Sequence, residues 1–324
     1  MIRTWHAVVL TVALVTAASL ASPFQITLLT KSVVWAILAM AVWFLLRICD
    51  RPSLGHAAFF GISAYVTAIA ITRWDYSNVW VVLGVSLVVS TVAGLFVAVI
   101  AGRLREVHFL LVTLAFAEML RSLTTRWREL GGDDGVTGVT RPSAWPLPID
   151  IGESQNLLWV SLGLLAVVVA VLVVVVRSPF GAVLLGMRDS ESRMSALGYS
   201  PFAYRTAGFT LSATIAGVAG ALNALLTRFV SPSELSPIVS ARALLIVVVG
   251  GAFALVGPVI VAFGLTFVED ILSSRTEHWA GIIGGLYVAI ALLRSVGWRA
   301  LAHKVVPRRV PRPVPPSTLS LEKP

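Results

Sequence analysis

The sequence predicts an all-α polytopic membrane protein with about eight transmembrane helices and a re-entrant helical hairpin. Of its 324 residues, 57% are hydrophobic and only 13% are charged, and the mean hydropathy is +0.88. Such a chain cannot cover a water-facing surface with polar groups, so the bilayer is its solvent. The excess positive charge, +9 in total, lies in short segments at the ends of apolar runs. This distribution is typical of cytoplasmic loops in membrane proteins and not of a nucleic-acid-binding surface.

Two apolar runs open the chain. Residues Ala7–Ser22 follow a short lead containing Arg3 and are either a first span or a cleaved signal peptide, because Ser19–Ala21 resembles a cleavage site. We expect the uncleaved span. A second run, Ser32–Leu46, ends at a charged segment that we expect to face the cytoplasm: Arg47, Asp50 and Arg51.

The third run, residues 53–72, is rich in small side chains that permit close helix packing in lipid. It also carries polar residues, and polar groups at membrane depth face either protein or a water-filled path. For any one of them packing is the favoured interpretation, and a substrate path is the alternative. These polar residues are Ser53, His56, Ser63 and Tyr65.

The next two runs have the length of spans. Val79–Ala101 is uncharged, and Val107–Leu123 carries Glu118 near its expected outer end. Glu118 is a candidate proton-relay carboxylate, but Arg121 lies one helical turn away. We therefore favour mutual neutralisation of this pair.

Residues 124–155 form the one long polar loop, which alternation places outside the membrane. Asp133 and Asp134 lack the spaced oxygen ligands and closing glutamate of an EF-hand, so a turn is expected there rather than a calcium site. The uncharged run Leu157–Val176 forms the sixth span, and Arg177 ends it on the inside.

The segment 188–201 is the most charged part of the chain's interior and lies between two apolar runs. It reads as a short amphipathic helix that Asp189 or Ser190 caps and that Gly198 and Pro201 end. It lies within a loop, residues 177–203, that alternation places in the cytoplasm. We expect it to be a docking element.

The seventh span, Thr206–Thr227, is again rich in small residues. The uncharged stretch Ala243–Val268 contains Gly250, Gly251, Gly257 and Pro258, which interrupt a helix, and it is too short for two full crossings. A re-entrant hairpin with its tip near 253–256 keeps the basic tail inside after the last span, Trp279–Leu293. The alternative is a tail outside.

The sequence lacks the motifs of several enzyme classes. The lysines are Lys31, Lys304 and Lys323, none of which follows glycine, so there is no Walker loop for binding ATP. Neither His-Glu-x-x-His nor Gly-x-Ser-x-Gly occurs, so a metalloprotease or a serine hydrolase has no support in the sequence. The single Cys49 excludes an intrachain disulfide and a cysteine-cluster metal site. We expect no enzyme activity, no metal and no cofactor in this chain.

Five segments, taken in order, resemble one family. They are Ser53–Gly61, Thr113–Met119, Gly131–Gly135, Arg188–Gly198, and Gly250–Gly251 with Gly257–Pro258. Together they are similar to the permeases of branched-chain amino-acid ABC importers, the LivM-like subunits, whose relatives handle urea and short amides. The resemblance covers roughly residues 30–295.

This resemblance implies an inner-membrane permease domain over residues 1–300, followed by a basic, proline-rich cytoplasmic tail, 301–324, that we expect to be disordered. The implied partners are a second permease subunit, two cytoplasmic ATPases that hold ATP and Mg²⁺, an external substrate-binding protein and membrane lipid, but no nucleic acid. The implied ATPase-coupling residues are Arg188, Asp189, Glu191, Ala196, Leu197 and Gly198. The candidate path residues are Ser53, His56, Phe59, Phe60, Ser63, Tyr65, Thr113, Gly250, Gly251, Gly257 and Pro258.

The expected function is uptake of branched-chain amino acids or related small polar solutes by alternating access, driven by the separate ATPases. The alternative is a proton-coupled carrier that uses Glu118. The two hypotheses differ in whether uptake requires ATP or requires that carboxylate.

Overall fold

The computed structural model describes residues 22–104, 106–145, 150–251, 255–279, 281–285, 287 and 289, and it is almost entirely helical. Residues 281–285 are helical and belong to a second compact unit that begins at residue 280. The α-helices of the first unit are α2 (Pro23–Arg47), α3 (His56–Thr72), α4 (Val79–Ala101), α5 (Glu106–Arg126), α6 (Ser154–Arg177), α7 (Pro179–Asp189), α8 (Glu191–Ala196), α9 (Pro201–Thr227), α10 (Pro237–Gly250) and α11 (Gly257–Ser273). The all-α prediction is confirmed.

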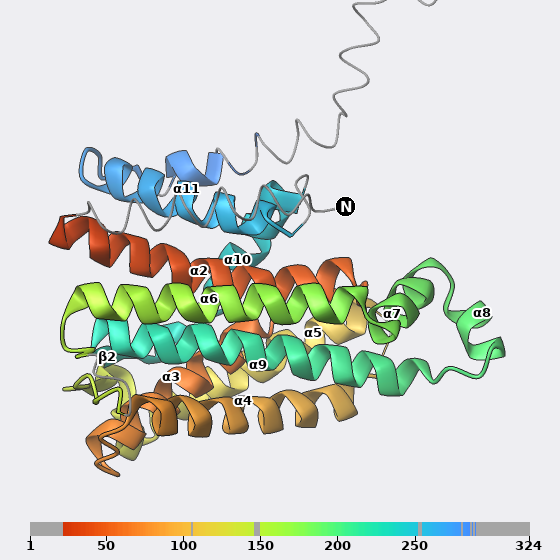
Figure 1. Cartoon of the computed structure of the whole chain (residues 1–324), viewed down its shortest axis with the longest axis horizontal. Helices are drawn as coiled ribbons and strands as arrows, with labels where there is room; N and C mark the ends of the chain where they lie inside the picture. Colours follow the sequence, from red (N-terminus) through yellow and green to blue (C-terminus); the bar gives the residue numbers. More distant parts are fainter. Residues whose placement is uncertain are drawn as a thin grey trace, which may run out of the picture. The chain divides into compact units, whose positions relative to one another are not determined.

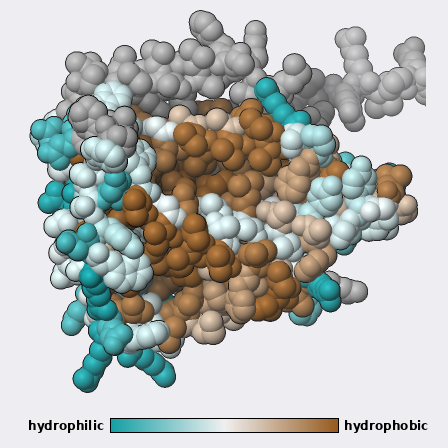
Figure 2. All heavy atoms as spheres, turned by 60° about the horizontal axis from the view of Figure 1, so that its bottom comes forward, coloured by the Kyte–Doolittle hydropathy of each residue, from teal (hydrophilic) through white to brown (hydrophobic). Residues whose placement is uncertain are grey.

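Five helices within the described residues are long and apolar enough to cross a bilayer, namely α2, α4, α5, α6 and α9. Two shorter apolar helices, α3 and α10, accompany them. Figure 2 shows hydrophobic residues spread across the middle of one face, with hydrophilic residues gathered at one end of it. This distribution is what a lipid-facing surface requires, and it confirms a polytopic membrane protein. The predicted first span, Ala7–Ser22, lies outside the described residues except for Ser22, and so do residues 280, 286, 288 and 290–293 of the predicted last span, Trp279–Leu293.

Helix α9 packs against α2, α3 and α4 and thereby holds the bundle together (Figure 1). Glycines permit the close approach. A Cβ atom on Gly220 would lie 1.9 Å from the backbone oxygen of Phe60, and one on Gly217 would lie 2.5 Å from Ser90 Oγ. The packing role that the small residues of 206–227 predict is confirmed.

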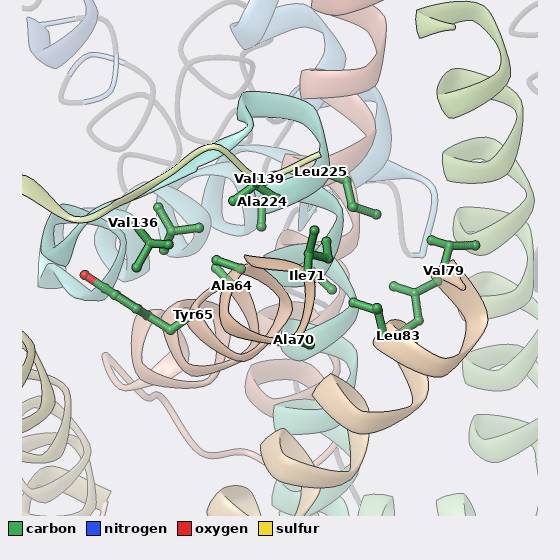
Figure 3. Close-up of a cluster of buried hydrophobic side chains, with 14 of the residues drawn as sticks. Ala64, Tyr65, Ala70, Ile71, Val79, Leu83, Val136, Val139, Ala224 and Leu225 are labelled. Carbon is green, nitrogen blue, oxygen red and sulfur yellow. The ribbon is translucent and has the colours of Figure 1, made fainter. Parts of the chain in front are cut away.

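Two short strands tie the long loop to the end of α9. Strand β1 (Val136–Thr137) pairs antiparallel with β2 (Phe229–Val230), with Val136 opposite Val230. Short 3-10 helices flank them: η1 (Arg128–Leu130), η2 (Gly132–Asp134) and η3 (Pro232–Leu235). Figure 3 shows side chains of α3, α4, α9 and the β1 segment pointing toward one another in a buried cluster. The loop 124–155 is therefore packed onto the bundle.

Three helix starts differ from those that the apolar runs predict. Helix α2 begins at Pro23 and not at Ser32, because Ser22 and Gln25 form a capping box and Pro23 fits the first turn. Helices α9 and α10 likewise begin at prolines, Pro201 and Pro237, after serine caps. Charged Lys31, Arg205 and Arg242 interrupt the apolar runs without interrupting the helices.

The predicted helical hairpin of residues 243–268 is present as α10 and α11, which pack on each other and on α2. The two helices approach closely where the chain turns: a Cβ atom on Gly250 would lie 2.6 Å from the carbonyl carbon of Gly257. Residues 252–254, which include the first half of the predicted tip at 253–256, lie outside the described residues.

The bundle has two chemically different ends. We call the one that holds α7 and α8 the basic end, and the one that holds β1 and β2 the sheet end (Figure 1). Among the side chains that the structure describes at the basic end, arginines outnumber carboxylates. The arginines are Arg47, Arg51, Arg103, Arg177, Arg188, Arg193 and Arg205, and the carboxylates are Asp50, Asp189 and Glu191.

Candidate functional site

The buried histidine of α3 joins three helices. His56 Nε2 lies 2.8 Å from Ser212 Oγ in α9, and Ser212 Oγ donates to the backbone oxygen of Ala41 in α2 at 2.7 Å. Because the single hydroxyl proton of Ser212 is engaged by Ala41, His56 Nε2 is the donor to Ser212. The ring is buried, and its Nδ1 atom has no hydrogen-bond partner among the described residues.

Further polar side chains of α3 and α4 also bond between helices. Ser63 Oγ donates to the Gly217 oxygen at 2.6 Å, and Ser90 Oγ donates to the Ala213 oxygen at 3.0 Å. Thr67 and Ser86 hydroxyls lie 2.8 Å apart. Hydrogen bonds of this kind contribute on average about 0.6 kcal/mol each inside a membrane. These polar groups thus join helices, and whether Ser63 and His56 also border a solute path stays a prediction.

The start of α3 is held by α10 and α5. The backbone N–H of Ala57 donates to Ser240 Oγ in α10 at 2.8 Å, which satisfies a donor of the first helical turn. Ser53 accepts from the Gly55 N–H at 3.1 Å. A Cβ atom on Gly55 would lie 2.8 Å from Thr113 Cβ in α5. Ser53 and Thr113 are buried, so α3, α5 and α10 meet at this point.

An aromatic cluster fills the space beside His56. Phe209 of α9 is its centre, with its ring centroid 5.5 Å from that of Phe59 and 5.3 Å from that of Phe109, both in edge-to-face geometry. Phe116 lies 6.2 Å from Phe59, and the His56 ring lies 6.5 Å from Phe209. Helices α3, α5 and α9 thus close against one another through aromatic rings.

The remaining path candidates of α3 lie toward the sheet end. Phe60 contributes its backbone oxygen to the close contact with Gly220. Tyr65 is buried in the cluster that includes Val136, and Figure 3 shows its ring beside that residue. Glu234 of η3 lies within electrostatic range of Tyr65. Burial raises the pKa of the Glu234 carboxyl, a feature that the sequence alone did not identify.

At the basic end, Arg47 connects the hairpin to α7. Its Nη2 donates to the backbone oxygen of Gly251 at 2.6 Å, and its own backbone oxygen accepts from Arg188 Nη1 at 2.8 Å. Gly250, Gly251, Gly257 and Pro258 therefore lie where the hairpin meets the last residue of α2. These two hydrogen bonds, which share Arg47, connect the charged segment at Arg188 with the hairpin at Gly251.

The charged segment consists of two helices where one was predicted. Arg188 and Asp189 end α7, and the chain bends at Ser190, whose hydroxyl accepts from the Arg193 N–H and caps α8. Gly198 follows α8 with φ of +89°, a conformation that favours glycine. The predicted serine cap is confirmed, and the single helix is corrected to α7 followed by α8.

Helix α8 projects from the bundle, and an ion pair links it to α9. Glu191 Oε2 lies 2.7 Å from Arg205 Nη2 in the second turn of α9. No residue of α8 is buried, and the Leu197 side chain that follows it is 72% exposed. Ala196 and Gly198 are also exposed. A single exposed leucine does not by itself identify a contact surface, so docking through Leu197 stays a prediction.

Glu118 forms the predicted pair with Arg121. Arg121 Nη2 lies 2.8 Å from Glu118 Oε2, one helical turn away on α5, and both side chains are partly exposed. The expectation that this carboxylate is neutralised by its neighbour is confirmed. Among the described residues, no group of three or more histidine, cysteine, aspartate or glutamate side chains could hold a metal ion.

Together these features define a polytopic α-helical membrane protein with a helical hairpin and with two charged helices, α7 and α8, at one end. The family described as "Branched-chain amino acid transport system / permease component" matches residues 24–292. The chain belongs to this family.

Two relatives are the high-affinity branched-chain amino acid transport system permease proteins LivM of Salmonella typhimurium and Escherichia coli. They are 27% and 26% identical to this chain over 306 residues, which cover 86% of this chain and 72% of each relative. No solved structure matches. The resemblance that the five motifs predicted is confirmed.

Proposed function

We propose that the chain is the transmembrane permease subunit of an ATP-driven importer in the bacterial inner membrane. In this proposal the basic end faces the cytoplasm, in agreement with its excess of arginine. The solutes are branched-chain amino acids, as the names of the relatives suggest, or related small polar solutes such as urea and amides. ATP and Mg²⁺ bind to separate ATPase subunits, a second permease subunit completes the membrane domain, and an external protein delivers the solute.

One observation carries the mechanism: besides the packing of α7 on the bundle, α7 and α8 make polar contacts with two separate parts of it. Glu191 of α8 pairs with Arg205 of α9, and Arg188 of α7 contacts the end of α2, whose Arg47 holds the hairpin at Gly251. A displacement of α7 and α8 by closing ATPases is therefore passed both to the central helix and to the hairpin. Two arrangements of these elements give alternating access.

The path itself is proposed to run beside α3, where the aromatic rings of Phe59, Phe109 and Phe209 close the bundle. Sliding of α9 relative to α3 and α5 separates these edge-to-face contacts. His56, Ser53, Thr113 and the hairpin glycines border the same region. Their role in solute passage stays a prediction.

The proposal is tested by reconstituting the chain with its candidate partner subunits in liposomes and measuring uptake of labelled leucine. We expect uptake to require two components: the external binding protein, and ATP on the side of the membrane where the ATPase subunits lie. Uptake that persists without ATP and follows an imposed proton gradient would favour the carrier hypothesis instead.

Replacement of Glu118 by glutamine separates the two hypotheses. Because Glu118 is paired with Arg121 and partly exposed, we expect ATP-dependent uptake to remain within about twofold of the unmodified protein, since such surface pairs contribute only about 0–1 kcal/mol. A loss of all uptake in Glu118→Gln, measured at equal protein level, would contradict the ATP-driven proposal.

Replacement of Arg47 by glutamine tests the connection between α7 and the hairpin. Loss of the charge-assisted bond to Gly251 costs about 1.5–3 kcal/mol, so we expect ATP-dependent uptake to fall by about tenfold or more. The matched control is Arg177→Gln at the same end, because Arg177 is exposed at the last residue of α6. Equal uptake in the two variants would remove Arg47 from the proposed route.

A further inference from the structure

An open pocket of about 610 Å³ lies at the basic end, away from the hairpin contact. It is lined by the segment after α2, the connection between α4 and α5 with the first turn of α5, helix α8 and the start of α9. The lining residues are Arg51, Arg103, Leu104, Val107, His108, Glu191 and Arg205. Four separate parts of the chain thus bring their polar side chains into one cavity.

The described side chains that line this pocket carry more positive than negative charge. They include three guanidinium groups, those of Arg51, Arg103 and Arg205, and one carboxylate, Glu191, which is paired with Arg205. His108 lies beside them. Arginine clusters of this kind bind phosphate through charge-assisted and bidentate hydrogen bonds.

The arginines are held in position by contacts within the chain. Arg51 Nη1 donates to the backbone oxygen of Leu104 at 2.5 Å, and its guanidinium lies 5.5 Å from the ring centroid of Phe109. The guanidinium of Arg103 lies 5.1 Å from the ring centroid of Phe202. Because these contacts fix the side chains before a ligand arrives, less conformational entropy is lost on binding.

Apolar surface adjoins the pocket on α5. Val107, which lines the pocket, is 69% exposed, and Leu111 one turn further along the helix is 53% exposed. Basic pockets that border lipid-facing helices on the cytoplasmic side bind anionic headgroups. The pocket joins a phosphate-binding lining to a surface on which acyl chains can lie.

We propose that this pocket binds the phosphate of an anionic phospholipid, with its acyl chains along α5. Arg103 and Arg205 contact the phosphate oxygens, and Arg51 supplies a fixed positive charge behind them. The headgroup shares Arg205 with Glu191, so the bound lipid touches the ion pair that holds α8. The proposal concerns binding and does not depend on the transported solute.

The test measures lipid retention by native mass spectrometry on the full-length chain, purified with any subunits that accompany it. Phosphatidylglycerol and phosphatidylcholine with the same acyl chains are compared. Both headgroups carry the phosphate, but the choline ammonium of phosphatidylcholine cancels its charge and is repelled by the guanidinium groups, so we expect the protein to prefer phosphatidylglycerol by about tenfold. We expect Arg103→Gln combined with Arg205→Gln to abolish the preference, and Arg177→Gln, which removes an exposed charge at the same end, to keep it.

Arg103→Gln alone guards against misfolding, because Arg103 is exposed, and it should weaken the preference in part. An unchanged preference in both pocket variants would overturn the proposal. Displacement of the lipid by millimolar inorganic phosphate, with equal retention of both lipids afterwards, would show a free-anion site and overturn the assignment to lipid.

Discussion

Replacing Gly220 by alanine is expected to prevent stable assembly of the bundle. The new Cβ atom would lie 1.9 Å from the backbone oxygen of Phe60, and backbone at a helix interface cannot move aside as a flexible side chain can. Overpacking of this kind typically costs about 1–3 kcal/mol, and the clash here involves the contact between α3 and α9. We expect a large loss of folded protein in detergent, measured by thermal denaturation and by monodisperse yield.

Gly163→Ala in α6 is the matched control, because nothing lies within 4 Å of a Cβ atom at that position. The same change there should leave the yield unaltered or raise it slightly, since alanine favours helix more than glycine does. If the two variants behave alike, close packing at Gly220 does not hold α9 in the bundle.

The sequence predicts the helices of this fold well because hydropathy and charge report directly on the bilayer. Val79–Ala101 is found with the predicted bounds, since an uncharged run of that length has few alternatives in lipid. Predictions failed where a charged residue lies within a helix. Because Lys31 interrupts the apolar run, the predicted span began only at Ser32 and missed the first turns of α2, whose start depends on the Ser22 cap and Pro23.

For the candidate site, the sequence predicted the type of contact but not which residues form it. The small residues of α9 indicated close packing, but the partner of Gly220, a backbone oxygen in α3, depends on register between helices far apart in the chain. Arg47 was read as a topological signal, and its bond to Gly251 depends on the fold of the hairpin. Ser212 and Ser240 carry no motif, so sequence reasoning did not identify them as partners of α3.

Replacing Glu191 by glutamine and Leu197 by alanine together is expected to uncouple ATP hydrolysis from uptake. Leu197 is 72% exposed in this subunit, and the ion pair of Glu191 with Arg205 is half exposed on the glutamate side. Their removal therefore changes the stability of the isolated chain by only about 1 kcal/mol. If an ATPase covers Leu197, truncation of the buried side chain costs the docked complex a further 2 kcal/mol or so.

The expected readout is a loss of leucine uptake of at least about tenfold, while the ATPases in the same vesicles continue to hydrolyse ATP. Val174→Ala, an exposed apolar residue of α6, removes similar surface without touching α8 and should keep uptake. The single variants separate two roles: Leu197→Ala tests docking of the partner, whereas Glu191→Gln tests transmission from α8 to α9 through Arg205. Retained uptake in the double variant would mean that α8 is a solvated loop, and the force from ATP hydrolysis would have to enter the bundle elsewhere.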